Sequence, residues 1–127
     1  NEHPFKYKGT VTCSDDFAKL EEASFDEIGY TDYIEEFKAV RKALPKDLPL
    51  LGTIQGAMVS AYHATDTPGN FVNLNNKISK AIRENPEAAC HAIEISAKAQ
   101  AKLCEMLMDA GCDGFFYAAL GGEKNKI

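Results

Sequence analysis

Long apolar runs are missing from this sequence. No hydrophobic stretch in the 127-residue chain approaches the ~20 residues that a membrane-spanning helix needs, and the first residues do not form the pattern of a secretory signal peptide. We therefore expect no membrane association and a cytoplasmic location. Hydrophobic residues make up 45% of the chain and charged residues 26%. This composition excludes a collagen-like, disordered or disulfide-dense chain and predicts a folded globular one.

An excess of basic residues is also missing. Fourteen Lys and Arg stand against nineteen Asp and Glu, a net charge of −5, so non-specific binding to nucleic acid has no electrostatic basis. The segment from Asp15 to Glu36 contains nine of the acids and one base, Lys19. Such a run is typical of a solvated surface. It lacks the regular ligand spacing of a calcium-binding loop.

The sequence also lacks a cluster of metal-ligating residues. The four cysteines, Cys13, Cys90, Cys104 and Cys112, form no Cys-x-x-Cys pair, and the three histidines are scattered along the chain. Structural zinc sites need thiolates or imidazoles at short, regular spacings. The sequence therefore predicts no metal site and no cofactor bound by this chain alone. It also predicts reduced thiols, as found in cytoplasmic proteins.

Helical patterns make up much of what is present. A short helix is expected over about 15–22, and a clearer one runs from the N-cap Thr31 to Pro45, which ends it. Residues 57–64 form a further short helix candidate. Another helix is expected to begin at the cap Asn70, because apolar residues then recur at helical spacing.

The longest predicted helix begins at Asn85 and Pro86 and ends at Gly111. Asn85 is a good N-cap, proline is favoured in the first turn, and glycine is the usual C-terminal stop. Its apolar and small residues recur every three or four positions. The predicted buried face consists of Ala89, Ile93, Ser96, Ala97, Gln100, Leu103, Cys104 and Leu107.

Two short apolar runs, 50–54 and 114–118, are typical of buried strands. Helices separate them in the sequence, and this alternation of strands and helices is typical of a parallel α/β sheet. Two parallel strands do not form a stable sheet alone, because each needs neighbours on its edges and faces. We therefore expect a helix-rich α/β chain with about two parallel strands. We also expect it to associate with other copies of itself or with missing parts of a larger sheet.

Reactive groups in parallel α/β folds gather beyond the carboxyl ends of the strands. Gln55 and Gly56 follow the first strand, and Tyr62 in the next helix is a candidate phenolic donor to a substrate carboxylate. Gly121 and Gly122 follow the second strand, where a glycine backbone allows close approach of a ligand or anion. These five residues are the candidate substrate-binding residues, and the catalytic residues stay unknown.

Four segments taken together carry a family resemblance. They are Val11–Leu20 (VTCSDDFAKL), Pro49–Met58 (PLLGTIQGAM), Asn85–Glu87 (NPE) and Ala110–Tyr117 (AGCDGFFY). In order and spacing they resemble a lead-in segment, a strand and loop, a helix start and a later strand of the uroporphyrinogen decarboxylase superfamily. The resemblance covers nearly the whole chain.

The resemblance implies a (β/α)8 barrel of about 250 residues. Residues 1–127 would then be a single central fragment, truncated at both ends. It further implies a parent enzyme that removes acetate carboxyls from a tetrapyrrole without a cofactor, as in porphyrin and haem biosynthesis. Tyr62 aligns with the substrate-contacting tyrosine of that family, whereas Ala119 stands where the family has a serine. The family's catalytic aspartate and late histidine would lie outside the chain, so we expect the isolated fragment to be inactive.

Two alternatives stay open. The same superfamily includes methyltransferases that move a methyl group between a corrinoid and a thiol, which would bring zinc and a corrinoid to the full-length parent. Decarboxylation needs an acid to protonate the pyrrole and cations to hold carboxylates, whereas thiol methylation needs a metal-bound thiolate. The second alternative is a non-catalytic helical interaction module, in which the acidic segment docks a partner.

Overall fold

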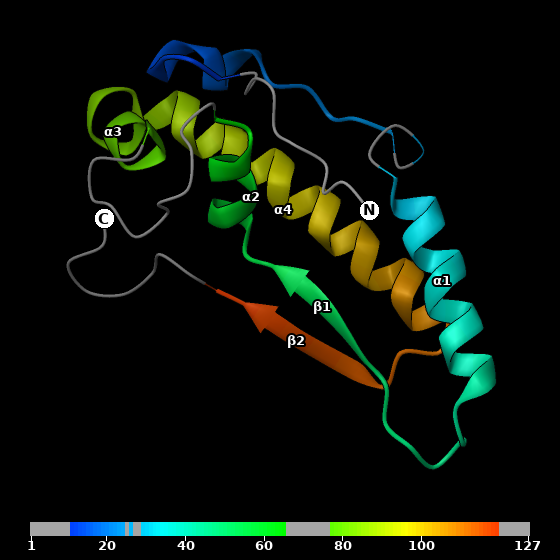
Figure 1. Cartoon of the computed structure of the whole chain (residues 1–127). Coiled ribbons are helices and arrows are strands. Elements are labelled where there is room, and N and C mark those ends of the chain that lie inside the picture. The colour runs from blue at the N-terminus through cyan, green and yellow to red at the C-terminus, as the bar shows by residue number, and fades with distance from the viewer. Residues whose placement is uncertain (1–10, 25, 27–28, 66–76, 120–127) are drawn as a thin grey trace, which may run out of the picture.

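The computed structural model describes residues 11–24, 26, 29–65 and 77–119. Within these residues the chain forms five helical elements and two strands, and Figure 1 shows their arrangement. In chain order they are the 3-10 helix η1 (Ser14–Lys19), α1 (Tyr30–Ala43), β1 (Leu51–Gln55), α2 (Ala57–His63), α3 (Lys77–Glu84), α4 (Pro86–Asp109) and β2 (Gly114–Ala118).

The two strands pair in parallel, as the sequence pattern predicts. Leu51 lies opposite Gly114 and Gln55 opposite Ala118, so the pairing covers both strands from end to end. Helices α2, α3 and α4 form the connection between them, which is the crossover that a parallel pair requires. The described residues therefore form a mixed α/β structure with one two-stranded parallel sheet. These elements do not show a barrel.

Helix α4 begins at the predicted Pro86 and ends at Asp109, two residues before the predicted stop Gly111. The Asn85 side chain accepts a hydrogen bond from the Ala88 amide, and Pro86 occupies the first turn. Gly111 has a φ of +92° just beyond the C-terminus, a conformation that favours glycine. The Cys112 amide returns to the Leu107 carbonyl at 3.0 Å and closes the helix end. Both helix boundaries are therefore set by local sequence.

Two hydrophobic clusters lie along α4. Figure 1 shows η1, α2 and α3 grouped at the beginning of α4, with α1 near its end and the sheet to one side. Because α4 contributes to both clusters, it acts as the common support of the fold. The first cluster includes Val11, Phe17, Ala61, Tyr62, Ile78, Ala88, Ala89 and Ala92. The second consists of Ile34, Phe37, Ile54, Leu103, Leu107 and Ala110.

Several local predictions need correction. The helix expected over 15–22 is a shorter 3-10 helix, Ser14–Lys19. Helix α1 has Gly29 rather than Thr31 as its N-cap, because Gly29 adopts a left-handed φ of 74° there. Residues 70–76 of the helix expected from Asn70 lie outside the described residues, and its described part is α3, which begins at Lys77.

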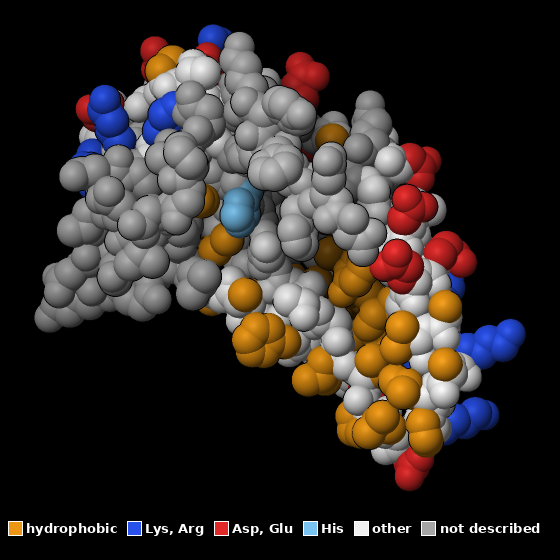
Figure 2. Space-filling model, in the orientation of Figure 1, with side chains coloured by type: hydrophobic (Ala, Val, Ile, Leu, Met, Phe, Trp, Pro, Cys, Tyr) orange, Lys and Arg blue, Asp and Glu red, His pale blue; other side chains and the backbone are white. Residues whose placement is uncertain are grey.

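The expectation of two buried strands is wrong for β2 and half right for β1. In β1, Gly52 and Ile54 are buried, whereas the alternate residues are exposed. In β2, Phe116 is 61% exposed and Tyr117 is 58% exposed. Hydrophobic side chains gather over the part of Figure 2 where the two strands lie in Figure 1. An apolar run predicts a strand, but burial also depends on what the surrounding structure places against it.

Candidate functional site

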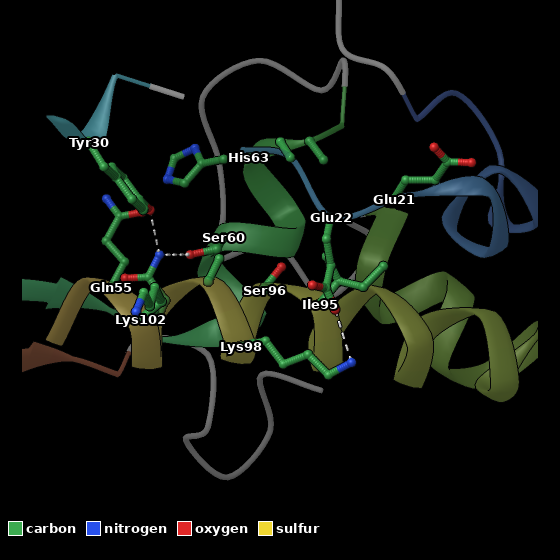
Figure 3. A pocket seen from close by; sticks show the side chains of 14 residues that line it. Glu21, Glu22, Tyr30, Gln55, Ser60, His63, Ile95, Ser96, Lys98 and Lys102 are labelled. Atoms are coloured by element: carbon green, nitrogen blue, oxygen red, sulfur yellow. Dashed lines mark hydrogen bonds and ion pairs between the residues drawn. The ribbon is translucent and has the colours of Figure 1, made fainter. Parts of the chain in front are cut away.

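A cavity of about 630 Å³ lies beside the carboxyl end of β1. It lies between α2, α4, the first residue of α1 and the segment that follows η1, and Figure 3 shows its side chains. Its volume is within the ~300–1,000 Å³ of typical small-molecule sites. The uncharged polar and imidazole side chains that line it are Tyr30, Gln55, Ser60, His63, Ser96 and Gln100.

Gln100 is held in place by hydroxyl groups from two other helices. Its Nε2 donates to Tyr30 Oη at 2.9 Å and to Ser60 Oγ at 3.4 Å, and both bonds are partly buried. The dashed lines in Figure 3 mark these bonds. An amide nitrogen has two protons to donate, so these contacts use both. The acceptor of this side chain, Oε1, is the group left for a ligand that carries an N–H or O–H donor.

Charged side chains surround the cavity. Lys98 Nζ pairs with Glu22 at 3.0 Å, and Lys102 Nζ pairs with Glu105 at 3.2 Å. The hydrogen bond to Glu22 is the main cause of a raised pKa for Lys98, so this ammonium stays charged at neutral pH. Both pairs are well exposed, and exposed ion pairs are weak. A ligand carboxylate therefore competes for either ammonium at small energetic cost.

Apolar side chains form the rest of the wall. Ala23 comes from the segment after η1, Ala64 follows α2, and Ile95 and Ala99 belong to α4. Small-molecule sites combine apolar walls with a few polar groups at fixed positions. This cavity has that combination, with Gln100 as the polar group whose position is best defined.

The structure separates the predicted site residues. Gln55 lines the cavity. Gly56 is buried, and its amide donates to the Ala118 carbonyl at 3.0 Å, which extends the contact between the strands. A Cβ at Gly56 would lie 3.2 Å from that carbonyl oxygen, so the close approach of the strands favours glycine there. Gly121 and Gly122 lie outside the described residues.

Tyr62 does not line the cavity. It is only 4% exposed and belongs to the hydrophobic cluster at the beginning of α4. Its ring contacts the neighbouring His63 edge to face, with 5.6 Å between the ring centres. His63 does line the cavity, so Tyr62 lies behind the wall rather than in it. A direct contact of Tyr62 with a substrate therefore stays a prediction.

The sequence contained a partial signal for Gln100. Both Gln100 and Ser96 fall on the predicted buried face of the longest helix, where most positions are apolar. A polar residue at such a position needs hydrogen-bond partners, and this requirement indicates a polar site. Tyr30 and Ser60 gave no comparable signal, because they are 70 and 40 residues from Gln100 in the chain.

Metal ligands do not converge in the described part of the chain. Among residues 11–24, 26, 29–65 and 77–119, no three His, Cys, Asp or Glu side chains are placed to hold one ion. The four cysteines are free thiols, and burial raises the pKa of the Cys104 thiol. Across the same residues, no helix combines the length and the apolar character needed to cross a membrane.

Three comparisons with known proteins give no match to this chain, whether against family models, curated proteins or solved structures. The function must therefore be argued from the site itself.

Proposed function

We propose that this chain is part of a (β/α)8 enzyme of the uroporphyrinogen decarboxylase superfamily, and that the cavity beside β1 binds a tetrapyrrole with carboxylate side chains. Two features support the fold proposal: the four ordered motifs, and a parallel pair joined through helices. The observation that supports the ligand proposal best is the fixed amide of Gln100 at the carboxyl end of β1.

The chemistry of the cavity matches such a ligand. A pyrrole N–H is a donor, and Gln100 Oε1 is an acceptor whose amide nitrogen is already committed to Tyr30 and Ser60. The acetate and propionate arms of a tetrapyrrole are carboxylates, and the ammonium groups of Lys98 and Lys102 lie among the cavity-lining residues. The faces of the pyrrole rings would lie against the apolar wall, which includes Ile95.

The reaction itself needs groups from beyond the described residues. Loss of a carboxyl from an acetate arm requires protonation of the pyrrole, and thus a positioned acid. In the proposed enzyme that acid comes from other strands of the barrel, and this chain supplies binding and orientation. The four free thiols support a reducing compartment, so we propose a cytoplasmic enzyme.

Binding of uroporphyrin to the chain tests this proposal. The dissociation constant is measured by the change in porphyrin fluorescence, for the wild-type chain and for Lys102→Met. We expect Lys102→Met to weaken binding about tenfold, because it removes one charge-assisted contact. Lys38→Met is the matched control, since Lys38 also pairs with a glutamate three residues away on an exposed helix face. Equal losses in the two variants, or no binding at all, would contradict the proposal.

The two alternatives predict different results in the same assay. Tighter binding of cobalamin than of uroporphyrin, with the same dependence on Lys102, would favour the corrinoid methyltransferase. A chain that binds neither ligand but unfolds cooperatively as a monomer would favour the helical interaction module.

A further inference from the structure

We propose that residues 20–24, the strap, act as a latch on the cavity. The Glu22 carboxylate occupies the ammonium of Lys98 until a carboxylate of the ligand displaces it, and the strap then separates from α4. The ligand class is a small molecule with several carboxylates. This inference deepens the proposed function and rests on it for the binding of carboxylates in the cavity, but not for the tetrapyrrole.

The strap is a weakly anchored segment between two well-anchored elements. It leaves η1 toward α1 without regular secondary structure, and Figure 1 shows its course. Residues 21–24 are exposed. Phe17 of η1 is buried, as are Ile34 and Phe37 of α1. Because local opening is easiest where few apolar side chains are buried, the strap can move while η1 and α1 stay in place.

Two contacts with α4 hold the strap, and they differ in strength. The Leu20 carbonyl accepts a hydrogen bond from His91 Nε2 at 2.9 Å, and the Leu20 side chain packs against the first hydrophobic cluster. Glu22 pairs with Lys98 Nζ at 3.0 Å, but these two side chains are 61% and 67% exposed. Exposed ion pairs contribute little stability. The Glu22 contact therefore opens first, and Leu20 serves as the fixed end.

The ion pair lies on the border between two cavities. A second cavity, of about 350 Å³, runs along η1 and α4 beside the first. The residues that line both cavities are Glu21, Glu22, Ile95 and Lys98. The dashed line from Glu22 to Lys98 in Figure 3 thus marks the place where the cavities meet. Release of the strap would join them and let a ligand with several carboxylate arms extend toward His91.

The other ammonium in the cavity gives a direct comparison. Lys102 pairs with Glu105, which lies three residues away on the same helix, so its displacement moves one side chain. Lys98 instead pairs with a residue 76 positions away in the chain, so displacement of Glu22 releases a separate segment. Binding at Lys98 is therefore coupled to movement of the strap. By linkage, a change that releases the strap from Lys98 should also strengthen binding of a carboxylate there.

The steady-state ¹H–¹⁵N NOE of the amides in residues 21–24 measures release of the strap, because it falls when a segment gains fast motion. In the full wild-type chain it should fall as citrate, a simple polycarboxylate, is added to saturation. Glu22→Gln should lower it without any ligand. Glu105→Gln is the matched control: it removes the same charge and frees Lys102, and the strap should keep its wild-type NOE.

Affinity for citrate and for uroporphyrin gives the second readout. Glu22→Gln should bind each anion about two- to fivefold more tightly, because the ligand no longer competes with an exposed ion pair. Lys98→Met should release the strap as Glu22→Gln does, yet weaken binding. Circular dichroism verifies that the variants fold. Release in both variants with affinity changes of opposite sign is the pattern that a latch predicts.

The outcomes separate the latch from the tetrapyrrole proposal. If citrate releases the strap and uroporphyrin binds no variant, the latch is supported and the tetrapyrrole ligand is rejected. If uroporphyrin binds but neither anion changes the strap of the wild type, the latch is overturned and the tetrapyrrole proposal stands. A strap that Glu22→Gln leaves as rigid as the wild type, or equal citrate affinity in the two chains, would also overturn the latch.

Discussion

Gln100 Nε2 donates a hydrogen bond to Tyr30 Oη at 2.9 Å and so joins the middle of α4 to the first residue of α1. Tyr30→Phe removes this bond and keeps the ring. We expect it to lower the free energy of unfolding by about 1 kcal/mol. Because the Gln100 amide then keeps only its longer bond to Ser60 Oγ, at 3.4 Å, it is less firmly oriented, and uroporphyrin binding should weaken as well. Urea denaturation measures the effect on stability, and the fluorescence titration measures the effect on binding. An unchanged affinity in Tyr30→Phe would show that the orientation of Gln100 does not matter for ligand binding.

A second long-range contact joins α1 to the sheet. Asp113 Oδ2 accepts from the Leu50 amide at 2.8 Å and from Arg41 Nη1 at 3.1 Å, and Arg41 also donates to the Leu48 and Pro45 carbonyls. Asp113→Ala should therefore lower the free energy of unfolding by about 1–2 kcal/mol. Lys38→Ala, which removes only an exposed pair, is the control. A double-mutant cycle with Arg41→Ala measures the coupling, and additive losses would rule out a shared network.

Gly29 and Gly111 both have a positive φ, but only Gly111 has a side chain packed close to it. Comparing alanine at the two positions therefore separates backbone strain from steric contact. Gly111 has a φ of +92°, and an added Cβ would lie 3.1 Å from Arg41 Cγ, whereas Gly29 has a φ of +74° and open space around it. Alanine in this conformation costs about 1–2 kcal/mol. We expect Gly111→Ala to destabilise the chain more than Gly29→Ala in thermal unfolding. The reverse order would mean that Arg41 does not pack against this helix end.

The carboxylate of Asp16 predicts a pH dependence. Lys19 Nζ donates to it at 2.8 Å, the Thr12 hydroxyl at 2.7 Å, and the Thr12 and Cys13 amides at 3.1 Å. These bonds hold the pKa of Asp16 well below its ordinary value of 3.8. A carboxyl with a lowered folded-state pKa stabilises the fold above the unfolded pKa, and this stability is lost as pH falls below about 4. Asp16→Asn should therefore cost more stability at pH 7 than at pH 2.5, measured by urea denaturation. Equal losses at both pH values would contradict this account.

Local signals explain which parts of the fold were predictable. Asn85, Pro86 and Gly111 fix the ends of α4 through caps and a left-handed turn, which depend on neighbours in the sequence. The parallel pairing followed from strands separated by helices. The exposure of Phe116 was not predictable, because an apolar run indicates a strand but does not say what covers it. The Gly29 cap was missed because glycine has no capping side chain.

The candidate site was predictable only in part. Gln55 lines the cavity because residues at the carboxyl end of a strand face such sites in parallel folds. Gln100 could be placed on an inward helix face, but its partners Tyr30 and Ser60 come from distant helices. Contacts of this kind depend on how the helices pack together, and no local pattern in the sequence encodes them.

Mapping the binding surface by two-dimensional ¹H–¹⁵N NMR during a uroporphyrin titration tests the central claim most directly. We predict the largest shift changes at the side-chain amides of Gln100 and Gln55 and at the backbone amides of Ser60 and Ser96, which all line the cavity. Changes confined to the aromatic residues of β2 would show that the porphyrin binds the exposed sheet instead. That result, or the absence of any change at saturating uroporphyrin, would contradict the assignment of this cavity as a tetrapyrrole site.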